Sequence, residues 1–456
     1  MPASKTGVEL ERLTLANGLR VVVAPDPTSA LVGVAVAYDV GWRSEPDERT
    51  GFAHLFEHMM FQGSAHVAKV EHMRLLEAAG GVFNGHTMAD VTSYYEALPA
   101  GGLELALWLE AERMGSLVVT EENLANQVSV VKEEINVNVL NQPYGGFPWI
   151  LLPEIAFDTY HNAHNGYGAF EHLEKATVAD AQDFYERYYA PSNAVVAVSG
   201  GCEPEEVALL AERHFAKIAG VPAPDHGPWL EPALTTERRR VVDDLRAPQP
   251  ALAAGFRTPD PIANLQDHVA YAVAAMVLGS GEASRLRSRL MHRDRTVTDV
   301  SCALGIFGID NFFMRAPVLF QLVMMHPGIV STDELLEVAV EELGRLAVEG
   351  PSGDELERVS ATFRSAYWRG LDSVMERSIA LAQLEVIHGR AELLDELPDL
   401  VTAVEREAVV VAAADLAAQR KAIVEIVPGD PHSVGDSTGS LRPADTKQRS
   451  GGRGTG

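Results

Sequence analysis

Residues 51–61 read GFAHLFEHMMF, and on an α-helix they divide into two stripes. The apolar stripe has the i, i+3, i+4, i+7 spacing that faces a core, and its members are Phe52, Leu55, Phe56, Met59 and Met60. The polar stripe holds His54, Glu57 and His58. At about 3.6 residues per turn, the two histidines lie one turn apart and project in nearly the same direction. The segment therefore predicts an amphipathic helix with two imidazoles and a carboxylate on its polar side.

Two imidazoles one turn apart suit a single metal ion. A catalytic zinc site needs three protein ligands, an open position for water and a nearby base. His54 and His58 supply two ligands, and Glu57 lies beside them, where it can take a proton from the water. A solvated polar helix face has the same residue pattern, so the helix by itself leaves that alternative open.

A third ligand is expected from the acidic pair in VSVVKEEINVNVL, residues 128–140. Helical spacing puts Gln127, Val131 and Glu134 on one stripe. Glu133 points about 100° away from that stripe. Glu134 is therefore the predicted third ligand, and the metal site joins two helices that are far apart in the sequence.

With these residues in place, the sequence resembles the inverzincin zinc peptidases, which include pitrilysin, insulin-degrading enzyme and the mitochondrial processing peptidases. In that family H-x-x-E-H precedes the glutamate ligand by some 76 residues, and here Glu134 follows His58 by 76 residues. GGVFNGHTMADVTSYYEALP, NQPYG, YYAPSNAVVAVSGG and RLRSRLMHRDRTVTDVS also resemble family segments, so the likeness extends over about residues 13–428. The resemblance implies that His54, His58 and Glu134 bind zinc and that Glu57 activates the attacking water.

The resemblance also implies a substrate contact, and it includes departures from the family pattern. Asn84 and Gly85 match an Asn-Ala pair next to the strand that pairs with extended substrate, although Asn84 also suits an ordinary turn. Gln127 stands where many relatives have Glu, and its amide can orient a metal ligand without supplying charge. His292 and Thr298 align with an Arg and a Tyr that meet the substrate in relatives. That contact is therefore missing here, or a partner chain supplies it.

Strand-like and helical segments come in blocks, which is typical of an α+β fold. Predicted strands cover residues 18–24, 31–38, 91–97 and 193–199. Predicted helices cover residues 50–61, 103–114, 121–140 and 178–189. The chain is expected to turn at residues 80–81 and to form a loop over residues 142–170.

Two short segments recur and predict a duplicated fold. AVVAV at residues 194–198 resembles AIVEI at residues 422–426, and MMFQGS at residues 59–64 resembles AMVLGS at residues 275–280. We expect two related α+β domains, each a mainly antiparallel sheet packed with helices. The predicted boundaries are a zinc-binding catalytic domain at 1–219, a linker at 220–250, a related domain without the metal motif at 251–431 and a disordered tail at 432–456.

Bulk composition bounds the function further. The 456 residues carry a net charge of −27, which repels nucleic acid. No apolar run reaches the roughly 18 residues of a membrane helix, and the first residues do not read as a secretory signal. Cys202 and Cys302 provide no disulfide framework. These features predict a cytoplasmic protein with neither nucleic-acid nor membrane partners.

The sequence as a whole predicts a zinc metalloendopeptidase that hydrolyses flexible or unfolded peptides. Half-length members of the family enclose substrate between two chains, so the resemblance implies a homodimer or a heterodimer with a related subunit. The absence of the Arg and Tyr contacts slightly favours the heterodimer over the homodimer. Two alternatives remain open, a non-catalytic assembly or peptide-recognition subunit of the same fold and a protein with a structural zinc site. Structural sites close with four ligands rich in Cys, and no fourth ligand is evident.

Overall fold

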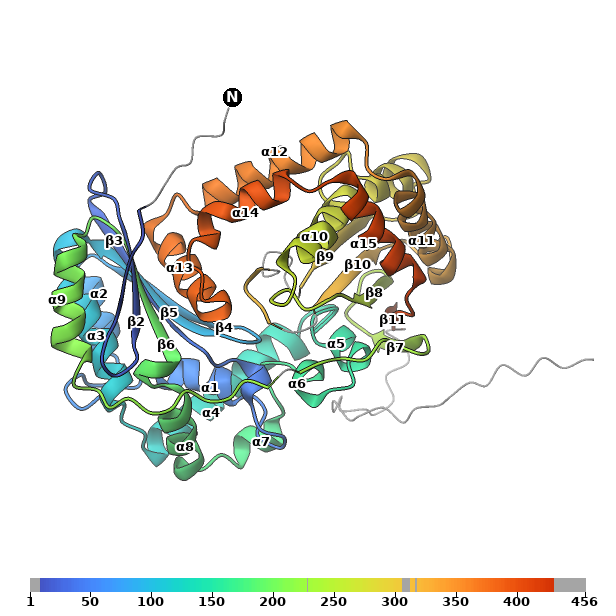
Figure 1. Cartoon of the computed structure of the whole chain (residues 1–456). Coiled ribbons are helices and arrows are strands. Elements are labelled where there is room, and N and C mark those ends of the chain that lie inside the picture. The colour runs from blue at the N-terminus through green and yellow to red at the C-terminus, as the bar shows by residue number, and fades with distance from the viewer. Residues whose placement is uncertain (1–8, 228, 306–311, 316–317, 430–456) are drawn as a thin grey trace, which may run out of the picture.

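The described part of the chain contains one mainly antiparallel sheet in each half (Figure 1). The computed structural model describes residues 9–227, 229–305, 312–315 and 318–429. The first sheet has the strand order β1-β2-β6-β3-β5-β4, and the second has the order β7-β11-β8-β10-β9. Helices pack on both sheets. The predicted α+β class is confirmed.

The elements follow one another in two similar series. The strands and helices of the first half are β1 Glu11–Thr14, β2 Arg20–Pro25, β3 Leu31–Tyr38, α1 Phe52–Met59, α2 Glu71–Ala78, β4 Val82–Thr87, β5 Thr92–Pro99, α3 Leu103–Ser116, α4 Glu121–Ile135, α5 Leu151–Ala156, α6 Tyr160–Ala163, α7 Phe170–Glu174, α8 Val178–Tyr188, β6 Ala194–Gly200 and α9 Pro204–Phe215. Those of the second half are β7 Arg238–Asp244, β8 Ala251–Arg257, α10 Leu265–Gly279, β9 Asp299–Leu304, β10 Leu319–Met325, α11 Thr332–Glu349, α12 Gly353–Gly370, α13 Val374–His388, α14 Leu393–Thr402, α15 Arg406–Ala418 and β11 Ala422–Pro428.

The two sheets repeat one pairing pattern. In the first, β2 runs parallel to β6, and β6-β3, β3-β5 and β5-β4 are antiparallel. In the second, β7 runs parallel to β11, and β11-β8, β8-β10 and β10-β9 are antiparallel. Strands β6 and β11, which carry AVVAV and AIVEI, hold equivalent places, as do α1 and α10. The predicted duplication is thereby confirmed.

The region between the halves contains regular structure. Strand β7 lies inside residues 220–250, which were predicted to be a linker, and it forms an edge of the second sheet. Its residues alternate between exposed and half-buried, so its hydrophobic signal is weak and the Pro-rich surroundings dominate. The predicted tail at 432–456 lies outside the described residues. The other domain boundaries stay a prediction.

The strands of the first sheet pack on two cores at once. Side chains alternate across a strand, and in β2 Val21 and Val23 face the helices of the first half, whereas Val22 and Ala24 join the core that extends through the second half. Both sets are buried. This burial explains why β2, β3 and β6 have continuous apolar runs and no polar face.

Helix α13 from the second half covers that second face of the first sheet. It packs on β3, β5 and β6, and Figure 1 shows it beside them. The contact is close, because a Cβ built on Gly33 of β3 would lie 2.3 Å from the backbone oxygen of Val374. Conversely, α5 from the first half packs on β7, β8 and β11 of the second sheet. Each half therefore lends a helix to the sheet of the other.

Most of the elements predicted in the first half are confirmed, with two kinds of error. The segment 142–170 was predicted as a loop, but it contains α5 and α6 and the first residue of α7. Strand β4 was missed, because Asn84 and Gly85 at its centre have low strand propensity. Asn84 and Gly85 thus lie within a strand and do not precede one. The helix at 121–140 is α4 followed by one π-helical segment, Asn136–Leu140.

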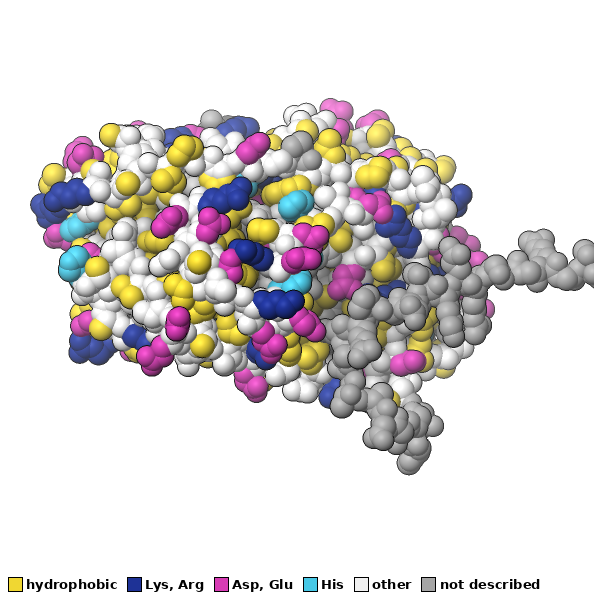
Figure 2. Space-filling model, turned by 90° about the horizontal axis from the view of Figure 1, so that it is seen from below, with side chains coloured by type: hydrophobic (Ala, Val, Ile, Leu, Met, Phe, Trp, Pro, Cys, Tyr) yellow, Lys and Arg dark blue, Asp and Glu magenta, His cyan; other side chains and the backbone are white. Residues whose placement is uncertain are grey.

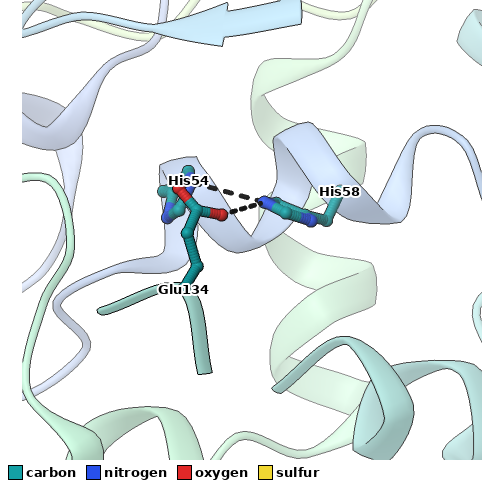
Figure 3. Close-up of side chains that lie close together, drawn as sticks. All are labelled: His54, His58 and Glu134. Atoms are coloured by element: carbon teal, nitrogen blue, oxygen red, sulfur yellow. Dashed lines mark hydrogen bonds and ion pairs between the residues drawn. The ribbon is translucent and has the colours of Figure 1, made fainter. Parts of the chain in front are cut away.

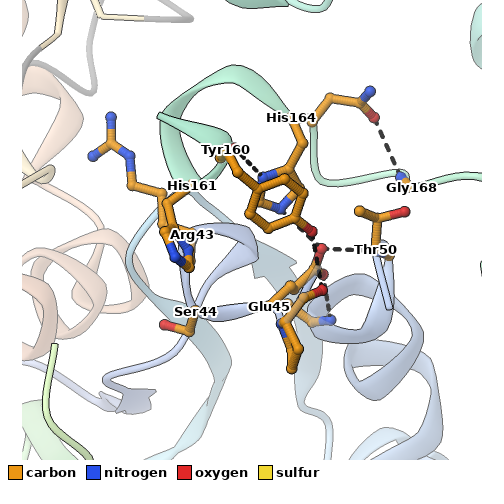
Figure 4. A network of polar contacts seen from close by, with 12 residues as sticks. Arg43, Ser44, Glu45, Thr50, Tyr160, His161, His164 and Gly168 are labelled. Atoms are coloured by element: carbon orange, nitrogen blue, oxygen red, sulfur yellow. Dashed lines mark hydrogen bonds and ion pairs between the residues drawn. The ribbon is translucent and has the colours of Figure 1, made fainter. Parts of the chain in front are cut away.

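A buried carboxylate fixes the start of α1 (Figure 4). Glu45 is fully buried and accepts hydrogen bonds of 2.8 Å from the backbone N–H groups of Gly51 and Ala53. These are among the donors that an α-helix leaves unpaired at its N-terminus. Gly51 adopts the left-handed conformation with φ 87°, which favours glycine. Glu45 therefore sets the position from which the polar stripe of α1 begins.

His164 completes this capping contact from a distant segment. Its Nε2 lies 3.2 Å from Glu45, and its ring stacks on Tyr160. Burial raises the pKa of Glu45, although the bonds from His164 and the backbone act in the opposite direction. Burial also disfavours charged His164, but the hydrogen bond and the charge of Glu45, together with backbone hydrogen bonds, outweigh burial and raise the pKa of His164. The two side chains thus form a buried pair that joins residues 160–164 to α1.

Charge on the surface is mixed rather than gathered by sign. In the view from below, Lys and Arg side chains lie among Asp and Glu side chains over the described residues (Figure 2). This face therefore presents no extended field of one sign, although the chain carries a net charge of −27. Among the described helices, none is both long and apolar enough to cross a membrane.

Replacing the capping carboxylate tests its structural role. Glu45→Ala leaves two buried N–H groups without acceptors, so we expect the free energy of unfolding to fall by about 1–3 kcal/mol. Urea denaturation measures the change. Glu77→Ala, at an exposed position of α2, is the matched control and should change stability by no more than about 0.5 kcal/mol. Equal midpoints for the two variants would contradict the capping role.

Candidate metal centre

Helices α1 and α4 bring His54, His58 and Glu134 together, as Figure 3 shows. The Nε2 atoms of the two histidines lie 3.3 Å apart. Oε1 of Glu134 lies 3.5 Å from Nε2 of His54, and Oε2 lies 3.2 Å from Nε2 of His58. The three side chains converge from two elements and could hold one divalent cation. The structure thus brings together the three side chains that helical spacing placed on two stripes in the sequence.

The cluster is partly buried, and Glu134 and His54 shift each other's pKa values. The exposed fractions are 11% for the His54 side chain and 29% for the Glu134 side chain. Hydrogen bonds with His54 and His58 hold the pKa of Glu134 well below its usual range. Burial disfavours charged His54, but its hydrogen bond to Glu134 and the nearby charge of Glu57 raise its pKa. A cation that binds here takes the place of a proton on the imidazole.

Glu57 faces the same space from α1 and is held by strand β4. The hydroxyl of Thr87 donates a 2.8 Å hydrogen bond to Oε2 of Glu57. A Cβ built on Gly85 would lie 3.2 Å from Cγ of Glu57 and 3.2 Å from Cδ1 of Tyr94. Glycine at position 85 therefore leaves room for the Glu57 side chain. Close packing against Glu57 and Tyr94 thus suits the glycine that stands here in place of the expected Ala.

A cavity of about 390 Å³ opens beside these residues. His54, Glu57 and Glu134 lie in its wall. Its apolar lining comes from both halves of the chain and includes Trp42, Trp149, Phe157, Met314, Val318 and Leu319. The carboxylate of Glu57 and two members of the His54–His58–Glu134 cluster thus lie next to a space that can take an apolar side chain.

The other residues singled out in the sequence lie in different surroundings. Asn84 is exposed on β4, which is an edge strand, and its side chain accepts a hydrogen bond from the N–H of Gly85. Gln127 is buried in α4, and its amide nitrogen donates to Asn126 at 3.0 Å. His292 pairs with Glu282 on the surface. Asn84, Gln127 and His292 all lie outside the described lining of the cavity.

Thr298 likewise lies away from the cluster. Its hydroxyl accepts a hydrogen bond from the side chain of Gln249 and donates one to the backbone oxygen of Met325. Like His292, it is outside the described cavity lining. The segment that aligns with the family's Arg and Tyr therefore does not bring this side chain to the metal-binding atoms.

Two residues beside Glu134 were missed by the sequence analysis. Tyr167 and Asn138 both lie within 3.5 Å of Oε1 of Glu134. Tyr167 belongs to the segment predicted as a featureless loop. Asn138 could have been noticed, because it follows Glu134 by four residues, the spacing that brings side chains together on a helix.

Comparisons with known families match both halves of the chain. A family model described as "Insulinase (Peptidase family M16)" matches residues 20–164. A second, described as "Peptidase M16 inactive domain", matches residues 175–363. The first match contains the H-x-x-E-H motif and Glu134, and the second covers much of the half that lacks the motif.

Individual proteins agree with these models. "Zinc protease PqqE" of Helicobacter pylori is 31% identical over 62% of this chain and 64% of its own length. "Probable mitochondrial-processing peptidase subunit beta" of Arabidopsis thaliana is 28% identical over 59% of this chain and 50% of its own length. The chain thus spans less than two thirds of either relative.

A solved structure extends the likeness to the whole fold. The crystal structure of a protease from Helicobacter pylori superposes with a TM-score of 0.83 at 24% identity, and the match covers 92% of this chain and 99% of that one. At this identity the superposition speaks for the fold alone. The matched models, the zinc protease relatives and the shared fold confirm the resemblance found in the sequence. The chain belongs to peptidase family M16, the insulinase or pitrilysin-like family.

Proposed function

We propose that this protein is a zinc metalloendopeptidase that hydrolyses flexible or unfolded peptides. The observation that carries the proposal is the convergence of His54, His58 and Glu134 beside Glu57. Zinc held by nitrogen and oxygen ligands has bonds of about 2.0–2.2 Å, so tetrahedral geometry separates the ligand atoms by about 3.3–3.6 Å. The Nε2 atoms of His54 and His58 lie 3.3 Å apart, and Oε2 of Glu134 lies 3.2 Å from Nε2 of His58, so both distances are close to this separation. Two imidazoles and a carboxylate also form a donor set that zinc accepts.

Glu57 is the proposed general base. When bound, zinc acts as a Lewis acid that makes water nucleophilic near neutral pH. Thr87 holds Oε2 of Glu57, which leaves Oε1 free to take a proton from the attacking water and pass it to the leaving amine. His54 and His58 project from the same helix, so base and ligands keep a fixed relation during the reaction.

Strand β4 is the proposed docking edge for substrate. As an edge strand, it has backbone groups that can pair with an extended peptide. Asn84 and Gly85 lie on this strand, and Gly85 approaches Glu57 closely. A peptide paired with β4 would therefore lie next to the proposed base. Such a site requires the substrate to be extended, which favours flexible or unfolded peptides.

The main alternative is a non-catalytic assembly or peptide-recognition subunit. The family model that matches the second half is described as an inactive domain. The metal cluster and Glu57 belong to the first half, where the matching model is described as insulinase. The presence of all four residues at one place favours catalysis, and the Glu57 variant below separates the two functions.

A second chain is the proposed partner, either another copy or a related subunit. The Arabidopsis relative is named as a subunit. His292 and Thr298 lie outside the described cavity lining, so the Arg and Tyr contacts expected in the family are not supplied from those two positions. A partner that completes the substrate chamber is consistent with both observations.

The cytoplasm is the proposed location. Cys202 and Cys302 are buried free thiols. Burial raises the pKa of both, to about 11 for Cys202, which keeps them protonated and unreactive. Thiols of this kind are usual in a reducing compartment.

Changing the base while keeping the ligands tests catalysis. Glu57→Gln should retain zinc but lower peptide cleavage by about 10²–10⁴-fold, because the amide cannot take the proton. Metal analysis and kcat for an unstructured peptide measure the two effects. Glu133→Gln, an exposed neighbour of the third ligand, should cleave like the wild type. Full activity in Glu57→Gln would remove the assigned base.

Removing and restoring the metal tests the ligand set. Chelation should abolish cleavage, and zinc at 100 times its Kd should restore it and raise stability by about 2.7 kcal/mol. Thermal unfolding with and without zinc measures the shift. His54→Ala should lose the shift, whereas His66→Ala, an exposed histidine paired with Glu112, should keep it. A zinc shift that survives in His54→Ala would contradict the site.

Dilution tests the partner. If two chains complete the chamber, cleavage per chain should fall as the protein dissociates, because the second wall is lost. Light scattering and rates across a dilution series measure both. Equal rates from monomer and dimer would contradict a shared chamber.

A further inference from the structure

Two side chains outside the predicted ligand set contact the third ligand. The hydroxyl of Tyr167 donates to Oε1 of Glu134 at 3.4 Å. The amide nitrogen of Asn138 reaches the same oxygen at 3.5 Å and also the Tyr167 hydroxyl at 3.5 Å. Both donors thus converge on one oxygen of the carboxylate. Oε1 also lies 3.5 Å from Nε2 of His54. Oε2 lies closer to an imidazole, 3.2 Å from Nε2 of His58, and has neither of the two donors.

The backbone places Asn138 for this contact. Helix α4 ends at Ile135, directly after Glu134, and continues as the π-helical segment Asn136–Leu140. A π turn holds an additional residue and often occurs at functional sites. The side chain of Asn138 therefore returns to the carboxylate of Glu134 although the regular helix has ended.

Tyr167 is held by its own surroundings. Its ring meets His54 edge to face, with centroids 5.1 Å apart, and packs against Trp149 at 5.5 Å. The side chain of Asn165 accepts hydrogen bonds from the backbone N–H groups of Tyr167 and Gly168. The ring is therefore fixed between a metal-binding imidazole and an aromatic wall, with its hydroxyl aimed at Glu134.

We propose that Tyr167 and Asn138 are positioning residues that hold Oε1 of Glu134, so that Oε2 binds the zinc ion. The inference rests on the proposed zinc peptidase function. It also accounts for Gln127, whose amide donates to Asn126 and contacts none of the three ligands among the described hydrogen bonds. The hydrogen bonds expected from Gln127 are thus supplied from the π-helical segment and the loop before α7.

Binding through one oxygen has a chemical consequence. Three protein ligands with one atom each leave the fourth position of a tetrahedral site open for water. A carboxylate that rotated and bound through both oxygens would fill that position. Donors on Oε1 oppose this rotation, and they also fix the carboxylate before the metal arrives, which favours affinity.

Removing each donor tests the proposal. Tyr167→Phe and Asn138→Ala should each weaken zinc binding by about 10-fold, because partners that orient metal ligands typically contribute 10–100-fold. Competition with a chromophoric chelator measures the Kd. The absorption of the Co²⁺-substituted protein should weaken as the coordination number rises. Tyr160→Phe, which loses a hydroxyl bonded to the oxygen of Pro46, and Asn136→Ala, which loses a contact to Glu133, are the matched controls.

The outcomes separate the two proposals. A wild-type protein that binds no zinc defeats the proposed function. A wild-type protein that binds zinc, with unchanged affinity and Co²⁺ spectrum in both variants, overturns the positioning role alone. If Tyr167→Phe fails to fold, Asn138→Ala decides, since Asn138 is exposed and its removal leaves no cavity. Weaker zinc binding in Tyr160→Phe or Asn136→Ala would also count against a specific effect.

Discussion

The first sheet is apolar on both faces, and this constraint organises the rest of the molecule. A sheet of this kind must be covered on two sides. Its own half supplies α1, α3 and α9 on one side, and the second half supplies α13 on the other. Because α13 packs on this sheet, part of the second half lies next to the edge strand β4. The hydrogen bond between Gln383 of α13 and His86 of β4, 2.7 Å long, marks the place where they meet.

The chemistry of the site follows from the same arrangement. One face of α1 packs into the core, so the opposite stripe points away from it, and His54 and Glu57 of that stripe line the cavity. Glu45 fixes where that helix starts, and α4 brings Glu134 to it from 76 residues away. Residues of the second half complete the wall. Thus a local pattern supplies His54, Glu57 and His58, and long-range packing encloses the space beside them.

Sequence reasoning predicted the parts whose signals are periodic or widely shared. Helix α1 and its two stripes follow from spacing alone. Glu134 follows from helical geometry together with the family spacing, and the duplication follows from two short repeated segments.

Other features depend on tertiary contacts that leave no local signal. Strand β4 has Asn84 and Gly85, two residue types that are depleted in strands, at its centre, and it pairs with β5. The pair of Glu45 and His164 joins positions 119 residues apart, and Tyr167 meets Glu134 across 33 residues. Strand β7, inside the predicted linker, was missed for a similar reason, because its residues pair with the distant strand β11.

The exchange of helices has a consequence for synthesis on the ribosome. The end of α13 at His388 follows the end of β6 at Gly200 by 188 residues (388 − 200). At roughly 5–20 residues per second, about 10–40 s pass between the emergence of the sheet and that of its cover. During this interval the apolar face of the sheet, which includes Val22, Ala35 and Val195, remains exposed to solvent. The nascent amino-terminal half therefore needs protection from aggregation until the later helix arrives.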